Sequence, residues 1–167
     1  HMDYNTTLLV AQGAAIISYI PVGMLAQRIG RKKSILAGVV MLTAAFFGAT
    51  FMTENSSIIV LNLLFALAGI GWATINVNSF PMVVELCSSK KIGRFTGYYY
   101  AASMSAQTIT PVALGFVLDA TMAWRTLPVY ASILTAASFL VFTLLVKNIK
   151  AKKVDHVKGL DALGADD

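Results

Sequence analysis

Groups that carry covalent or metal chemistry are scarce in this sequence. Cys87 is its single cysteine, so an internal disulfide cannot form. The two histidines do not cluster with the cysteine in the spacing of a metal site. Neither a pair of carboxylates nor a nucleophile beside a base suggests an active site. We therefore expect no metal, no other cofactor and no enzyme.

Charge is also scarce, and it is distributed unevenly. Charged residues make up 13% of the chain and apolar residues 57%, which is far from the balance of soluble proteins. The apolar residues form long runs without the alternation of barrel strands, so an all-α membrane protein is predicted. The net charge of +5 could suggest nucleic acid, but the cations lie beside apolar runs of spanning length. We expect the lipid bilayer, and no nucleic acid, as a partner.

Five segments are long and apolar enough to cross a bilayer as helices. They are residues 7–25, 34–52, 57–84, 95–118 and 127–146, separated by polar breaks at 27–33, 53–56, 85–94 and 119–125. Such short connections predict antiparallel neighbours. The predicted organisation is a cloning remnant with an external segment (1–6), a five-span domain (7–146) and a basic, disordered tail (147–167).

Basic residues indicate how the spans are oriented. Twelve of the thirteen lysines and arginines fall on one side of the predicted spans, and only Arg125 falls on the other. Because such residues are retained in the cytoplasm during insertion, we expect a cytoplasmic carboxyl terminus and an external amino terminus. The expected location is the plasma membrane. Five spans after an external start also lead us to expect a further helix upstream.

The first basic connection contains a spaced motif. Its residues include two glycines, one glutamine and three cations: Gly23, Gln27, Arg28, Gly30, Arg31 and Lys32. Gly23 would permit close helix approach, and Gly30 a tight turn with positive φ. This pattern resembles the signature loop of the major facilitator superfamily, Gly-x-x-x-Asp-Arg-x-Gly-Arg-Arg/Lys. Gln27 replaces its acidic residue, so a salt bridge made by that carboxylate cannot form here.

The resemblance implies a partial six-helix half-bundle, equivalent to helices eight to twelve of that superfamily. The segment 93–100, followed by Gln107, Pro111, Gly115 and Asp119, resembles its eleventh helix, and residues 69–73 and 81–84 resemble the sucrose and glycoside branch. The implied function is a secondary transporter that moves a small polar solute, such as a sugar, by alternating access with a missing amino-terminal half. The span cores contain no acidic or basic residue, so a proton-symport group would lie in that other half.

Polar residues within the spans are the candidates for solute binding, because they are costly in hydrocarbon unless they face a cavity or another helix. Polar and aromatic residues at helical spacing form one stripe on the fourth span and smaller stripes on the third and first spans. They are Gln107, Tyr100, Ser103 and Thr110 on the fourth span, Trp72 and Asn76 on the third, and Gln12 and Tyr19 on the first. Asn78 is turned about 200° from Asn76 around the helix, so its side chain must face another direction. For every candidate, hydrogen bonding between helices remains the structural alternative.

Gating is expected at the basic connections and at two prolines. Pro81 and Pro111 each remove a helical amide donor and could act as hinges, although proline is also tolerated in membrane helices for packing reasons. Glu85 could pair with Arg94 or Arg31 as a latch. The alternative function is a non-transporting membrane interaction or scaffold protein. A homo-oligomer could cover the polar face of the chain if the other half were absent.

Overall fold

The computed structural model of the chain describes residues 4–53, 56–87, 89–121 and 126–146, and it is all-helical over these ranges. Its five α-helices and single 3-10 turn are α1 (Tyr4–Ile29), α2 (Arg31–Thr50), α3 (Ile58–Leu86), η1 (Ser89–Lys91), α4 (Ile92–Thr121) and α5 (Thr126–Leu145). Each α-helix is long and apolar enough to cross a membrane. The predicted all-α membrane fold is confirmed, while the predicted tail (147–167) lies outside the described residues.

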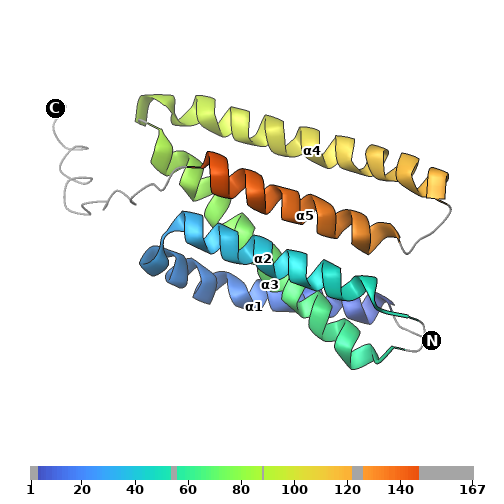
Figure 1. Cartoon of the computed structure of the whole chain (residues 1–167). Helices are drawn as coiled ribbons and strands as arrows, with labels where there is room; N and C mark the ends of the chain where they lie inside the picture. The colour runs from blue at the N-terminus through green and yellow to red at the C-terminus, as the bar shows by residue number, and fades with distance from the viewer. Residues whose placement is uncertain (1–3, 54–55, 88, 122–125, 147–167) are drawn as a thin grey trace, which may run out of the picture.

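Successive helices run in opposite directions, as predicted from the short connections (Figure 1). The joint between α1 and α2 therefore lies at the same end of the molecule as the joint between α3 and α4. We call this end the basic end, because the described cations gather there: Arg28, Arg31, Lys32, Lys33, Lys90, Lys91 and Arg94. The gathering of these cations at one end agrees with the uneven distribution of lysine and arginine that the sequence predicts.

Helices α1 and α4 extend at both ends beyond the apolar runs that identified them. The described α1 begins three residues before the predicted span and ends four residues after it. A helical backbone keeps its hydrogen bonds beyond the hydrocarbon, so hydropathy marks only the central part of these two helices. The predicted break at 27–33 was wrong in extent, because Gly30 alone separates α1 from α2. Its φ of 93° confirms the predicted positive-φ turn.

Glycines bring three backbones into contact near the middle of the bundle. A methyl group added at Gly38 of α2 would lie 2.8 Å from the carbonyl oxygen of Gly71 on α3. One added at Gly69 of α3 would collide with the backbone carbonyl of Ala11 on α1. At Gly23 it would make only ordinary contact, 3.5 Å from Val77. The close approaches that hold α1 and α2 against α3 therefore lie at Gly38, Gly69 and Gly71.

The core lies between α2, α3 and α5, whereas α4 is the least packed helix. Ile35, Val39 and Met82 form a buried cluster against which Phe139 and Phe142 of α5 pack. The absence of amides from α2 and α5 fits this arrangement, because their packed sides meet apolar side chains. In contrast, no residue of α4 between Ile92 and Ala120 is buried. Figure 1 shows α4 as the outermost helix, with α5 between it and α2.

Candidate functional site

The candidate residues Gln107 and Trp72 lie at the same depth, near the middle of their helices. Gln107 is the sixteenth of the 30 residues of α4, and Trp72 is the fifteenth of the 29 residues of α3. The rings of Phe80 and Tyr100 are 5.9 Å apart and fix the relative height of α3 and α4. From that contact, both Gln107 and Trp72 lie about 10 to 12 Å farther from the basic end.

The amides of the candidate stripes are exposed and bonded only within their own helices. Gln107 Nε2 donates to Ser103 Oγ at 3.2 Å, which confirms that these two residues share a face. Asn76 Nδ2 donates to the Trp72 carbonyl at 2.9 Å. Both amides therefore retain hydrogen-bonding capacity that other groups could use. Gln12 is also exposed and lies on α1, which packs closely against α3.

Aromatic side chains make the contact between α3 and α4. Phe80 lies 5.8 Å from the ring of Tyr99 as well as 5.9 Å from that of Tyr100. Tyr100 therefore packs against α3, although its side chain is still 49% exposed. Trp72 is 57% exposed and Tyr19 39% exposed, so much of each remains free to meet a solute. The structural alternative therefore applies to Tyr100, and its role in solute binding stays a prediction.

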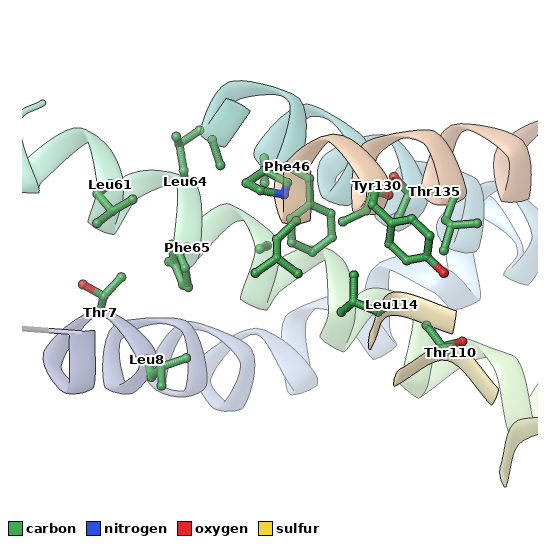
Figure 2. Close-up of a pocket in the computed structure, with 17 residues that line it drawn as sticks. Thr7, Leu8, Phe46, Leu61, Leu64, Phe65, Thr110, Leu114, Tyr130 and Thr135 are labelled. Carbon is green, nitrogen blue, oxygen red and sulfur yellow. Dashed lines mark hydrogen bonds between the residues drawn. The ribbon is translucent and has the colours of Figure 1, made fainter. Parts of the chain in front are cut away.

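A cavity of about 750 Å³ lies at the end opposite the basic end, among all five helices (Figure 2). Its walls are mainly aliphatic and aromatic, with side chains such as Leu64, Phe65 and Leu114. Of the predicted site residues, Thr110 alone lines it, while Gln107 lies one helical turn nearer the basic end. A cavity with so few polar groups disfavours a charged solute, because charge would lose its hydration there without compensation.

A three-residue network joins α2 to α3 at the basic end. Arg31 Nε lies 3.2 Å from Glu85 Oε1, and Arg31 Nη1 lies 3.1 Å from Asn78 Oδ1. Asn78 is fully buried and donates its own amide to the Thr74 carbonyl at 2.7 Å. The guanidinium can satisfy two acceptors because its donors form a fork. A buried amide thus holds the cation that pairs with the half-buried Glu85.

Arg31 is the partner of Glu85, and Arg94 is engaged elsewhere. Arg94 Nε donates to the Tyr98 hydroxyl at 2.8 Å, and its guanidinium carbon lies 5.4 Å from the centre of that ring. Of the two pairings predicted for Glu85, the structure therefore has the one with Arg31, between α2 and α3, while its function as a latch stays a prediction. Gln27 and Arg28, which precede Arg31 in the same motif, are exposed.

The prolines expected to act as hinges lie inside continuous helices. Pro81 is within α3 and Pro111 within α4, and α1 contains a third, Pro21. Pro81 follows Phe80, so the aromatic contact with α4 adjoins the position where α3 lacks an amide donor. Bending of α3 at Pro81 or of α4 at Pro111 during function stays a prediction.

Sequence reasoning missed the roles of Asn78 and Lys32. Asn78 precedes Glu85 by seven residues, so both lie on one helix face, and this spacing was the available signal. Lys32 donates from Nζ to the Thr143 carbonyl at 3.3 Å, joining α2 to the last turn of α5. No local pattern identifies that acceptor, because it is a main-chain group 111 residues away. Among the described residues, no three His, Cys, Asp or Glu side chains are grouped to hold a metal.

Comparison with known proteins adds one match. The family model described as Major Facilitator Superfamily matches residues 3–162, which include all five helices. No curated protein matches the chain.

Proposed function

Because the chain belongs to the major facilitator superfamily, whose members transport small solutes, we propose that it supplies helices eight to twelve of a secondary transporter. In this proposal α1, α3 and α4 form one wall of the solute site, and the amino-terminal half of the same transporter forms the other. The protein would reside in the plasma membrane with its basic end in the cytoplasm, as its lysines and arginines predict.

The observation that carries this proposal is the exposure of two amides at mid-helix depth. Gln107 and Asn76 are exposed where hydrocarbon would penalise polar groups, and each makes only a hydrogen bond within its own helix. A water-filled, solute-binding cavity removes that penalty. We therefore assign both residues to the solute-facing wall, together with Trp72 and Tyr100.

The chemistry of this wall favours a neutral, hydroxyl-rich solute, and a sugar is the first candidate. Amides and hydroxyls can donate to and accept from sugar hydroxyls, while aromatic rings cover the apolar faces of the pyranose. No acidic or basic residue lies in the central turns of the described helices. Coupling to a proton or cation would therefore depend on a group in the other half.

The Arg31–Glu85–Asn78 network and the helix prolines would control access. In one conformation the network holds α2 to α3 at the basic end. Pro81 lies between Asn78 and Glu85, so bending there would change the network itself, whereas bending at Pro111 would let part of α4 move independently of it. This arrangement separates the binding surface, at mid-depth, from the contacts that close the cytoplasmic side.

Flux measurements on the full-length protein test the proposal. The protein is reconstituted in liposomes, and uptake of radiolabelled mono- and disaccharides is compared with uptake of charged solutes of similar size, with and without a proton gradient. We expect saturable uptake of a neutral solute that is competed by its unlabelled form. Absence of solute-dependent flux from folded full-length protein, across the panel, would favour the scaffold alternative.

A further inference from the structure

An apolar groove of about 450 Å³ runs between α2 and α5, away from the solute-facing residues. One wall includes Val40, Ala44 and Phe47 of α2, and the other includes Ala136 and Leu140 of α5. All five are exposed. Phe139 is half-buried and packs on the core, so it forms part of the floor.

The α2 wall of this groove continues to a lysine at the basic end. Lys33, Ala37, Val40, Ala44 and Phe47 follow one another at spacings of three or four residues, and all are exposed. Residues at this spacing lie on one helix face. Lys33 therefore stands above the groove on the same face, and it makes no hydrogen bond or ion pair within the described part of the chain.

A second lysine lies across the seam between the same two helices. Lys32 Nζ donates to the carbonyl of Thr143, which follows Leu140 of the groove by three residues on α5. Its ammonium group is thus placed where α2 meets the end of α5. One hydrogen bond leaves two of its three donors for another acceptor. The basic end has one described carboxylate in this region, Glu85, and it is paired with Arg31.

The distances along the helix match the dimensions of a lipid leaflet. Val40 is seven residues from Lys33 and Ala44 is eleven, which corresponds to about 10 and about 16 Å along α2. Half of the hydrocarbon core of a bilayer is about 15 Å thick. An acyl chain whose headgroup lies at Lys33 would therefore cover the groove as far as Ala44.

We propose that the seam between α2 and α5 binds one anionic phospholipid, with its phosphate at Lys32 and Lys33 and one acyl chain in the groove. The charge of the two lysines complements an anionic headgroup, and the apolar walls complement hydrocarbon. The site is distinct from the solute-facing wall, and it does not depend on the transport function.

Native mass spectrometry of the delipidated chain tests this proposal. The detergent-solubilised protein is titrated with phosphatidylglycerol or with phosphatidylcholine of the same acyl chains. We expect one phosphatidylglycerol to bind at least about tenfold more tightly, because each lysine near an anionic headgroup contributes about 1 kcal/mol. Equal affinity for the two lipids would overturn the proposal, as would binding of glycerol phosphate alone with the affinity of the whole lipid.

Matched variants locate the site. Lys33→Gln should weaken phosphatidylglycerol binding about fivefold and leave phosphatidylcholine binding unchanged, whereas Lys90→Gln, at the same end but on η1, should change neither. Ala44→Leu or Ala136→Leu should weaken both lipids by filling the groove, and Ala101→Leu on exposed α4 should not. Equal losses in Lys33→Gln and Lys90→Gln would show a diffuse charge effect and overturn the site. A protein dimer that covers the seam and that phosphatidylglycerol does not displace would overturn it as well, because a second copy would then be the occupant.

Discussion

Asn78 and Arg31 are 47 residues apart in the chain, yet the buried amide oxygen of Asn78 accepts a hydrogen bond of 3.1 Å from the guanidinium of Arg31. The two residues lie on different helices, and Asn78 has no exposed surface. The cation at the beginning of α2 is therefore anchored inside the bundle as well as to the carboxylate of Glu85.

Replacing this amide should destabilise the protein more than replacing a nearby one. Asn78→Leu removes a buried acceptor of a charged donor, and we expect the free energy of unfolding to fall by about 1 to 3 kcal/mol. Asn76→Leu, two residues away and exposed, should change it by less than about 0.5 kcal/mol. Denaturant titration in detergent micelles measures both. Equal effects would mean that the Arg31 contact contributes nothing specific.

The pair of Arg31 and Glu85 should show a measurable but small coupling. Their side chains are 20% and 27% exposed, so solvent screens the pair and a coupling energy of about 0.5 to 1 kcal/mol is expected. A double-mutant cycle with Arg31→Gln and Glu85→Gln measures it. The matched cycle with Arg94→Gln and Glu85→Gln should give no coupling, since Arg94 contacts Tyr98 instead. A larger coupling in the second cycle would contradict the observed pairing.

The contact between α1 and α3 should not tolerate a methyl group at Gly69. Gly69→Ala would place its methyl against the backbone of Ala11, and overpacking of this kind costs about 1 to 3 kcal/mol. Gly97→Ala on α4 has nothing within 4 Å of the added methyl, and alanine is the better helix former by up to about 1 kcal/mol. We therefore expect a lower melting temperature for the first variant and an unchanged or higher one for the second.

Transport by the proposed full-length protein should depend on Gln107. Loss of one solute hydrogen bond of about 1.4 kcal/mol lowers affinity about tenfold, so Gln107→Leu should raise the apparent KM by about that factor. Thr108→Val is the control, because Thr108 lies about 100° round the same helix and its hydroxyl is bonded to the Met104 carbonyl. If Gln107→Leu lowers thermal stability without changing affinity, the amide is a packing residue, and Asn76 becomes the next candidate.

Membrane orientation can be tested by labelling single cysteines in a Cys87→Ser background. Gln27 lies at the basic end and Ser57 at the opposite end, and both are exposed. An impermeant thiol reagent should label Ser57→Cys in intact cells and Gln27→Cys only after permeabilisation. The reverse pattern would place the basic end outside and overturn the expected cytoplasmic carboxyl terminus.

The number of helices, their directions and the turn at Gly30 were predictable because each depends on local sequence. Apolar runs of spanning length identify the helices, and only glycine adopts positive φ readily. The extent of the helices beyond those runs was less predictable, since hydropathy does not detect helical turns in the polar interface.

Contacts between helices were predictable only in part. The seven-residue spacing of Asn78 and Glu85 places both on one face of α3. Whether Arg31 or Arg94 pairs with Glu85 depends on how α2 and α4 approach α3. The backbone contact of Gly69 with Ala11 has no sequence signal beyond a small residue, and small residues are common in these helices. The solute-binding role of Gln107, Tyr100 and Trp72 stays a prediction, because the spacing of polar residues on a helix does not specify which solute they meet.

Because Gly30 is the single residue between α1 and α2, the register of one helix relative to the other cannot change without disturbing their contacts. A residue inserted after Gly30, if it joined α2, would rotate the rest of that helix by about 100° and advance it by about 1.5 Å. Arg31 would turn away from Glu85, and Gly38 would be replaced at its crossing with Gly71 by a bulkier neighbour. A connection several residues long would absorb such an insertion as a bulge, but this one has no spare backbone. Deep insertion scanning should therefore find 29–31 as intolerant as the glycine crossing itself, although it lies at the surface.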